Sequence, residues 1–343
     1  MNIVLVYLGS YLPDYVILNL RRLIKLFPQY SVLILVDHDH DIDEDLSNNL
    51  FKVSIDSRWL SANDLTSSRL TFREGFWYKT LARFEALRVY SSLNPTLRIL
   101  HVESDVWLSP SFPLSYFSVT NYEIAYPLAN EYEGVASTLF LKNYEAIQNL
   151  CQLGKELFAH DQSLTDVILL GKHYRCFPDK VLILPTMTNF SPSFNIHVDG
   201  KLRDLMSKNV DGLPGIFDAS TWGQFLTGKD PQNDFGFRIV FKYQRHHAID
   251  PRPFSFSIDQ GRLFISFQNN KTEVFSLHIH SKDKRIFRIN DQKILLRRTR
   301  FYEKSKKIKF EFVPRIFIMN LPTYIKYTIY STLKYVKLLK DGS

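Results

Sequence analysis

The stretch Arg98-Ile-Leu-His-Val-Glu-Ser-Asp-Val-Trp-Leu108 decides what fold this chain is expected to adopt. Its first five residues are mainly apolar or β-branched and include no Gly or Pro, which predicts a buried β-strand over residues 98–102. Glu103 and Asp105 follow at i and i+2, so both carboxylates should point the same way at the C-terminal end of that strand. Ligands bind at this end of the strands in open α/β sheets. The two acids are therefore either solvated loop charges or a pair that holds a divalent cation.

The segments before this strand alternate between strand and helix patterns. Residues 3–7 and 31–36 have the composition of buried strands, and residues 15–26 between them have helical apolar spacing. This βαβ order predicts an α/β fold with a Rossmann-like, mostly parallel central sheet flanked by helices. A further helix is expected over residues 74–90, directly before the strand of residues 98–102.

Shorter elements are expected after the acids. Strands are predicted over residues 124–128 and 135–141, and a helix over residues 162–170 with Asp161 as its N-cap. Gly, Pro, Asn and Asp punctuate residues 186–234, which indicates long functional loops. A smaller β-rich C-terminal portion should follow, with these strands: residues 237–243, a hairpin of 254–258 with 263–267, and 273–280.

Composition limits the class of protein. The two cysteines, Cys151 and Cys176, lack metal-type spacing, which favours a reducing compartment and excludes a disulfide scaffold. The N-terminal residues lack a basic segment followed by a long apolar one, and no window has the ~18 apolar residues of a membrane span. We therefore expect a soluble or peripheral protein in the cytoplasm.

The positive charge is concentrated at the C-terminus. From Lys284 onward there are sixteen Lys or Arg and four Asp or Glu residues, so this tail carries +12 and the preceding residues −4 of the total +8. Residues 322–340 have the spacing of an amphipathic helix with one basic side. This pattern predicts a tail, residues 284–343, that either lies on an anionic membrane or docks on the protein itself. Nucleic-acid binding is not expected, because no nucleic-acid-binding fold accompanies the charge.

Two groups of basic side chains and histidines are expected near the acids. Lys79 and Arg83 are spaced i, i+4, so they share a helix face and either hold diphosphate oxygens or form ion pairs on a solvated face. In the strand of residues 273–280, His278 and His280 share a face, and Lys282 continues the pattern. A histidine there would complete a Mn²⁺ site and the lysine would neutralise phosphate; the alternative is two ordinary strand histidines.

A third segment, Phe217-Asp-Ala-Ser-Thr-Trp-Gly-Gln-Phe225, is expected to begin a helix capped by Asp218. Asp218, Trp222 and Gln224 would face a polyhydroxylated ligand, because sugar sites combine an aromatic platform with a few hydrogen-bonding groups. A capped surface helix is the competing interpretation.

Taken in order, these residues resemble GT-A glycosyltransferases of the D-x-D type, and among them the bacterial family 8-like and family 32-like groups. The resemblance is strongest over residues 1–108, where Leu-Ala-Arg83-Phe precedes an E-x-D variant, Glu103-Ser-Asp105. Asp161-Gln162 is similar to the D-Q pair near the reacting sugar, and His-Ile-His280-Ser-Lys282 resembles the late histidine ligand and its lysine. The chain departs from family 8 in Tyr7-Leu-Gly-Ser10, which lacks first-strand acids, and in Glu133-Gly-Val-Ala-Ser137, which replaces N-x-G.

The resemblance implies a GT-A-like catalytic domain over residues 1–283, with a nucleotide-sugar-binding half over residues 1–110 and acceptor-side loops over residues 186–235. It implies transfer of a hexose, UDP-linked, to a glycan or lipid-linked acceptor in bacterial surface polysaccharide or related glycan synthesis. The implied roles are as follows: metal ligands for Mn²⁺ or Mg²⁺, Glu103, Asp105 and His278 or His280; phosphate contacts, Lys79, Arg83 and Lys282; groups near the sugars, Asp161, Gln162 and Asp218.

Two other functions stay open. A sugar nucleotidyltransferase would use a similar sheet, but it usually carries a Gly-rich phosphate loop after the first strand, and Tyr7-Leu-Gly-Ser10 has few glycines. A non-catalytic glycan-binding or membrane-scaffolding protein with a decayed site is the other alternative. Binding of Mn²⁺ together with Mn²⁺-promoted hydrolysis of a UDP- or GDP-sugar would distinguish the transferase from both.

Overall fold

The architecture was determined from a computed structural model, which describes residues 1–54, 76–161, 163–188, 200–207, 213–228, 248–282 and 284–287. These residues belong to the first of two units into which the chain divides, Met1–Leu296. Glu74, Gln162, the strand expected at residues 237–243 and the basic tail beyond residue 287 lie outside the described residues.

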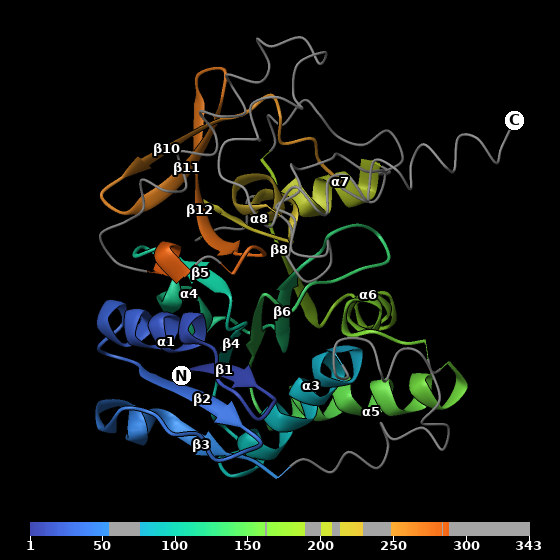
Figure 1. The fold of residues 1–343 in the computed structure, drawn as a ribbon. Helices are drawn as coiled ribbons and strands as arrows, with labels where there is room; N and C mark the ends of the chain where they lie inside the picture. The colour runs from blue at the N-terminus through green and yellow to red at the C-terminus, as the bar shows by residue number, and fades with distance from the viewer. Residues whose placement is uncertain are drawn as a thin grey trace, which may run out of the picture. The chain divides into compact units, whose positions relative to one another are not determined.

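A seven-stranded sheet runs through this unit in the order β3-β2-β1-β4-β7-β6-β8 (Figure 1). Its strands, in chain order, are β1 Asn2–Tyr7, β2 Ser31–Val36, β3 Leu50–Lys52, β4 Ile99–Val102, β6 Ile124–Pro127, β7 Thr138–Leu141 and β8 Val181–Leu184. All neighbouring pairs are parallel except the two made by β7, which is antiparallel to β4 and β6. The predicted α/β class with a mostly parallel central sheet is confirmed.

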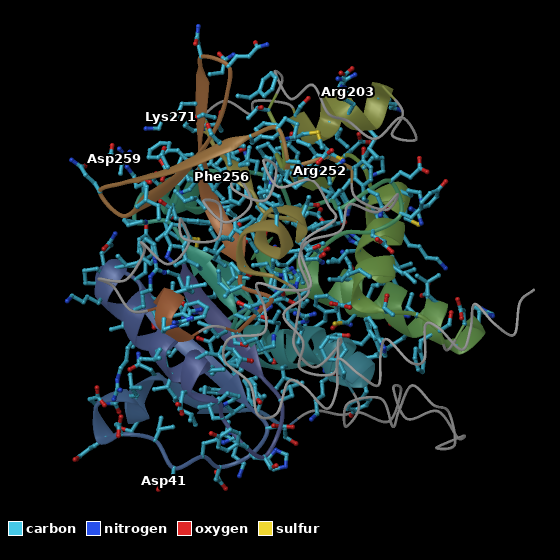
Figure 2. The ribbon with its side chains drawn as sticks, turned by 45° about the horizontal axis from the view of Figure 1, so that its top comes forward. Asp41, Arg203, Arg252, Phe256, Asp259 and Lys271 are labelled. Carbon is cyan, nitrogen blue, oxygen red and sulfur yellow. The ribbon has the colours of Figure 1, made fainter. Side chains whose placement is uncertain are left out.

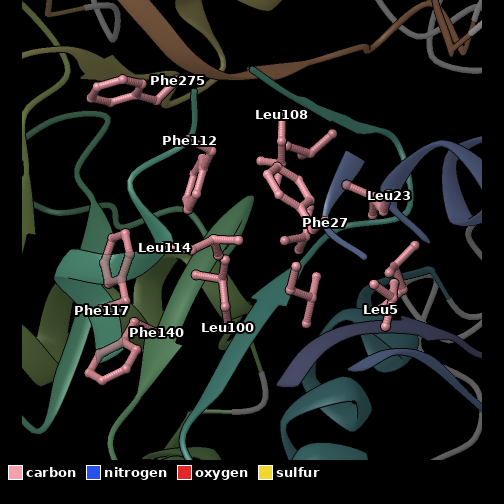
Figure 3. Packing of buried hydrophobic residues seen from close by; sticks show 14 of the residues in the cluster. Leu5, Leu23, Phe27, Leu100, Leu108, Phe112, Leu114, Phe117, Phe140 and Phe275 are labelled. Carbon is pink, nitrogen blue, oxygen red and sulfur yellow. The ribbon is translucent and has the colours of Figure 1, made fainter. Parts of the chain in front are cut away.

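Helices pack on this sheet. The helices of this part are α1 Asp14–Leu26, α3 Phe76–Ser92, α4 Leu114–Val119, α5 Tyr144–His160 and α6 Asp166–Cys176, together with the 3-10 helix η1 Glu44–Asn49. Alternate residues of the strands, such as Leu5 and Leu100, form one core with α1 residues such as Leu23 (Figure 3). Since successive strand residues face opposite sides, α1 covers one face of the sheet. α3 and α5 pack against each other, α3 also against β1 and α5 also against β7.

A second, antiparallel sheet supplies the β-rich portion, in the order β10-β11-β12-β5. Its strands are β5 Val106–Leu108, β10 Ser255–Asp259, β11 Arg262–Phe267 and β12 Asn270–His278, with β9 Ile216–Phe217 parallel to β12. The predicted hairpin is confirmed: Gln260 and Gly261 turn it with φ of 46° and 81°, the positive values that a type I′ turn requires. Figure 2 shows Asp259 and Lys271 of this hairpin region projecting outward, with Asp41 at another edge.

Several predicted boundaries were wrong. The helix expected to begin at residue 162 begins at Asp166, because α5 extends to His160 and Asp161 ends that helix by donating its N–H to Leu157 O at 2.9 Å. Thr165 caps α6 instead, accepting from the N–H of Ile168 at 3.4 Å. The strand expected through residue 280 ends at His278.

The segment expected as loops also contains regular structure. Residues 186–234 include α7 Gly200–Ser207, β9 and α8 Thr221–Thr227. Within the described part, no helix has both the length and the apolar character needed to cross a bilayer.

Candidate metal centre where the two sheets meet

Three side chains that can ligate a metal converge where β4 of the central sheet passes into β5 of the second sheet. One ligand atom from each of Glu103, Asp105 and His278 lies within 4.8 Å of the others. His278 Nε2 is 3.2 Å from Asp105 Oδ2, and His278 Nδ1 is 3.6 Å from Glu103 Oε2. The sequence expectation that a late histidine meets the two acids therefore has a geometric counterpart, with His278 in that position.

Strand pairing holds these residues in register. Val106 of β5 pairs with His278 of β12, and Ile279 N donates to Asp105 O at 2.8 Å. On the other side, Glu103 N donates to Ser137 O at 3.1 Å, next to β7. The acids thus occupy the three-residue connection between two sheets, with partners fixed on both sides.

The second histidine lies beside the first but outside the three-ligand group. The ring of His280 stacks on that of His278, with 3.9 Å between centroids and 21° between planes. Because β12 ends at His278, this contact comes from a tight turn, in which His280 N donates to His278 O at 3.1 Å, and not from strand alternation. Burial and the neighbouring His278 hold the pKa of His280 well below its usual value.

Arg83 of α3 is buried between two carboxylates. Its guanidinium donates to Glu103 Oε1 and to Asp166 Oδ2, and its Nε donates to Thr80 O at 2.9 Å. Burial opposes the charge on Arg83, but Glu103 and Asp166 outweigh that penalty and raise its pKa. Arg83 therefore fixes one oxygen of Glu103; its expected contact with phosphate stays a prediction.

Lys282 reaches the centre from the turn after β12. Its Nζ lies 2.5 Å from Asp105 Oδ2 and 5.5 Å from the centroid of the Tyr15 ring. Burial raises the pKa of Tyr15 to about 12, so its phenol stays neutral. Lys282 adopts φ 50°, a left-handed backbone that turns the chain back toward the acids.

The protonation states follow from burial and these pairs. Burial would raise the pKa of Asp105, yet His278 and Lys282 hold it well below its usual range. Burial likewise works against ionised Glu103, but Arg83 and His278 lower its pKa overall. The same carboxylates overcome burial at His278 and raise its pKa to about 9. Both acids are thus ionised at neutral pH.

The residues present fit a divalent cation. Within the described part of the chain, Glu103 Oε2 and His278 Nδ1 are buried and make no hydrogen bond, although they lie close to each other. Buried polar atoms without partners are costly, and a cation between them would satisfy both. Two carboxylates and one imidazole suit Mn²⁺, and carboxylates suit Mg²⁺.

The chain is similar in structure to glycosyltransferases. The galactosyltransferase LgtC, solved with donor and acceptor sugar analogues, is 13% identical, and the match covers 61% of this chain and 84% of LgtC with a TM-score of 0.41. A glycosyltransferase involved in glycosylation of the major capsid of PBCV-1 is 12% identical over 55% of this chain and 85% of its own, with a TM-score of 0.34. GlyE of Streptococcus pneumoniae TIGR4 is 14% identical over 52% and 44% of the two chains, with a TM-score of 0.33. No protein-family model and no curated protein matches the sequence.

Asp218 contacts the backbone of His278 and is fully buried. Its Oδ1 accepts from Trp222 N at 3.0 Å, and its Oδ2 accepts from Gly223 N at 2.7 Å and His278 N at 3.0 Å. Burial raises the pKa of Asp218 to about 6. The predicted cap of α8 is therefore present, and the same carboxylate also ties α8 to the end of β12.

The prediction that Trp222 forms an aromatic platform for a sugar is wrong. Its side chain is 1% exposed, its Nε1 donates to Thr186 O at 2.9 Å, and its ring packs edge-on against Phe254 and Phe256. Apolar burial explains the difference, because α8 packs on the second sheet and the indole fills the space between them. Gln224 is partly exposed, with Nε2 3.4 Å from Ser220 Oγ.

Two further predicted residues lie elsewhere. Lys79 points to the loop after β1: a Cβ on Gly9 would lie 3.5 Å from Lys79 Nζ, and Gly9 N donates to Asp37 Oδ1 at 2.9 Å. Lys79 therefore lies beside the loop after β1, whereas Arg83 contacts the acids after β4 and at the start of α6. Asp161 is exposed at the end of α5, where its Oδ1 accepts from Ser163 N at 2.8 Å. Its predicted partner Gln162 lies outside the described residues.

Asp166 was not anticipated from the sequence. It occupies the first turn of α6, where an acid is expected for the helix dipole alone. Only its burial, at 4% exposed, and its contact with Arg83 distinguish it. The sequence places this acid immediately before the apolar run Val-Ile-Leu-Leu. Acids are common at that position of a helix, so the pattern does not distinguish a buried ion pair from an ordinary helix start.

Proposed function

We propose that this chain transfers a hexose from a nucleotide diphosphate sugar, UDP-linked, to a glycan or lipid-linked acceptor in a metal-dependent reaction. The observation that carries the proposal is the convergence of Glu103, Asp105 and His278 at the C-terminal end of β4. The order of motifs along the chain, which resembles that of GT-A glycosyltransferases, supports the same reaction. We place the reaction in bacterial surface polysaccharide or related glycan synthesis.

Glu103, Asp105 and His278 would hold Mn²⁺ or Mg²⁺, which when bound supplies Lewis-acid stabilisation of the leaving diphosphate. Lys282, which forms an ion pair with Asp105, would contact phosphate oxygens. Lys79 beside Gly9 would add a second positive charge at the end of β1. Fixed charges of this kind stabilise negative charge that develops on a leaving group.

Asp161, Gln162 and Asp218 are the groups that we propose next to the sugars. Asp161 is exposed, and the resemblance of Asp161-Gln162 to the D-Q pair of GT-A glycosyltransferases supports a place for both residues near the donor sugar. Asp218 can accept a proton, because its pKa of about 6 lies near neutrality, but both of its oxygens are engaged by backbone N–H groups. We therefore propose that Asp161, in preference to Asp218, is the group that contacts the substrate.

The decisive experiment combines binding and turnover on the full chain. Mn²⁺ binding would be measured by calorimetry, and release of nucleoside diphosphate would be followed with a panel of UDP- and GDP-sugars. We expect both in the wild type and loss of both in Asp105→Asn, whereas Asp259→Asn in the exposed hairpin turn should match the wild type. Absence of Mn²⁺ binding and of nucleotide-sugar turnover in the wild type would end the transferase proposal.

The same panel separates the alternatives. A nucleotidyltransferase would release pyrophosphate from a nucleoside triphosphate and a sugar 1-phosphate. A binding or scaffold protein would retain a glycan without turnover, and Asp105→Asn would leave that retention unchanged.

We also propose that the chain acts at the inner face of the cytoplasmic membrane through its basic tail. The sixteen basic residues from Lys284 onward support this placement, since each adds roughly 1 kcal/mol near an anionic surface. Sedimentation with phosphatidylserine vesicles should decline as salt rises. Equal sedimentation with neutral vesicles would argue against the electrostatic contact.

A further inference from the structure

Asn19, a fully buried residue in the middle of α1, touches the chain on both sides of Asp105. Its Nδ2 donates to Ser104 O at 3.1 Å and to Val106 O at 2.9 Å. A primary amide has two N–H hydrogens, so one side-chain nitrogen serves both carbonyls. The opposite orientation of the amide would place its oxygen against two carbonyl oxygens, and this fixes which atom faces the strand.

Three consecutive carbonyls around Asp105 are thereby held from two directions. Ser104 O and Val106 O accept from Asn19, while Asp105 O accepts from Ile279 N at 2.8 Å. Ile279 directly follows His278 in the sequence, and the His278 ring faces the Asp105 carboxylate. α1, β5 and the end of β12 are therefore joined at the peptide units that set the distance between Asp105 and His278.

Burying the polar amide of Asn19 in the core costs free energy unless the amide forms hydrogen bonds. It lies on the apolar side of α1, among Val16, Leu20 and Leu23, all 0% exposed. An amide in such surroundings loses its water, and the two Nδ2 hydrogen bonds recover only part of that loss, because the buried Oδ1 has no hydrogen-bond partner among the described residues. An apolar residue would satisfy the packing alone, so the packing does not explain the amide.

We propose that Asn19 is a positioning residue of the candidate metal centre, which fixes Asp105 relative to His278 through the two flanking carbonyls. This inference rests on the proposed metal-dependent function but concerns a residue that touches neither metal nor substrate. Residues that orient metal ligands typically contribute 10- to 100-fold to affinity. Asn19 acts in that way on the backbone of a ligand.

The test is Mn²⁺ affinity of the full chain, measured by calorimetry and by the electron paramagnetic resonance signal of free Mn²⁺. Asn19→Leu keeps the number and branching of the side-chain heavy atoms and removes both N–H donors, so we expect Mn²⁺ to bind about 10- to 100-fold more weakly. Asn49→Leu is the matched control, because Asn49 Nδ2 also donates to a backbone carbonyl, Val32 O at 2.8 Å, away from the centre. Its Mn²⁺ affinity should match that of the wild type.

Arg22→Met separates positioning from general loss of stability. Arg22 donates to Leu108 O and lies 4.9 Å over the Trp107 ring, so it binds the same strand beyond Asp105. We expect this variant to lose stability but to keep its Mn²⁺ affinity within about twofold. Equal weakening of Mn²⁺ binding in Arg22→Met and Asn19→Leu would overturn the specific role of Asn19.

If Asn19→Leu does not fold, Asn19→Ser replaces it, since a hydroxyl has one hydrogen and serves at most one carbonyl. Wild-type affinity in the folded Asn19 variant overturns the inference and leaves the proposed function intact. Failure of both variants to fold also overturns it and makes Asn19 a determinant of folding only. Absence of Mn²⁺ binding in the wild type defeats the proposed function itself.

Discussion

Gly223 in the first turn of α8 lies directly against the carbonyl of His278, and a side chain at this position would overlap that oxygen. A Cβ on Gly223 would also come within 2.6 Å of Asp218 Oδ2. The backbone of His278 is thus clamped by a helix whose close approach depends on a residue without a side chain. The metal centre therefore depends on the packing of α8 as well as on its own acids.

Gly223→Ala should consequently push His278 away from Asp105. We expect lower stability, by about 1–3 kcal/mol as in other overpacked sites, together with weaker Mn²⁺ binding. Gly200→Ala is the matched control, because nothing lies within 4 Å of a Cβ there. Urea unfolding and calorimetry check both effects, and unchanged stability in Gly223→Ala would contradict the close contact.

Asp218→Asn tests the carboxylate that holds the same helix. Asp218 accepts three backbone N–H groups, and an asparagine oxygen cannot replace both carboxylate oxygens while its NH₂ faces a donor. We expect a loss of about 1–3 kcal/mol in the free energy of unfolding, the cost of unsatisfied buried groups. The measurement is urea unfolding at pH 8, with the exposed Asp259→Asn as the neutral comparison.

Arg83→Met should be among the most destabilising substitutions in the described chain. It would leave Glu103 and Asp166 buried and without their guanidinium, which typically costs about 3–5 kcal/mol. Arg252→Met breaks the more exposed pair with Asp250 and should cost about 0–1 kcal/mol. The labelled Arg252 side chain can be followed in Figure 2.

Adding Asp166→Leu to Arg83→Met should recover part of the loss, because it removes one of the two stranded carboxylates. A double-mutant cycle in urea measures the coupling between the two positions. Independent, additive effects would show that the Arg83–Asp166 pair does not exist in solution.

Acid should weaken the fold through two buried histidines. Burial lowers the pKa of His101 and His173 from 6.5 to about 4. Between these values the unfolded chain binds a proton and the folded chain does not, so stability falls as pH falls from 6.5 to 4 and is fully present above 6.5. Each histidine would contribute up to about 3 kcal/mol of this loss.

His173→Gln should therefore flatten the dependence of the free energy of unfolding on pH between 4 and 6.5. Exposed His160 at the end of α5 provides the matched substitution, His160→Gln, which should leave the slope unchanged. Urea unfolding at several pH values makes the comparison. An identical slope in His173→Gln and wild type would mean that folding does not lower the pKa of His173.

The elements that the sequence predicted well are those specified by their own residues. β2 was predicted at its observed bounds, residues 31–36, because a continuous apolar run fixes a buried strand locally. β5 and β9 were missed because they are three and two residues long and exist through their pairing with β12, far along the chain. α5, entered from an Asn143 cap, was also not singled out.

The contacts of the candidate site also fall into those that local sequence predicted and those that depend on the fold. The pairing of Glu103 with Asp105 followed from i, i+2 spacing, and the approach of a late histidine followed from the resemblance. The engagement of Arg83 by Asp166 and the bonds of Asn19 join helices to loops across the fold, and no spacing rule encodes them. The same limit explains Trp222, since whether an aromatic residue faces a ligand or the core depends on what packs against it.

The passage from β4 to β5 makes the chain switch sheets within Glu103-Ser-Asp105, while His278 comes from the end of β12, much later in the sequence. A cation on these side chains would act as a reversible cross-link between the first third of the chain and its β-rich portion. Unlike a disulfide, it could be added or withdrawn by mass action, so the thermal midpoint should rise with Mn²⁺ concentration and return on chelation. The same three residues would then both connect the two sheets and hold the cation used in the proposed reaction.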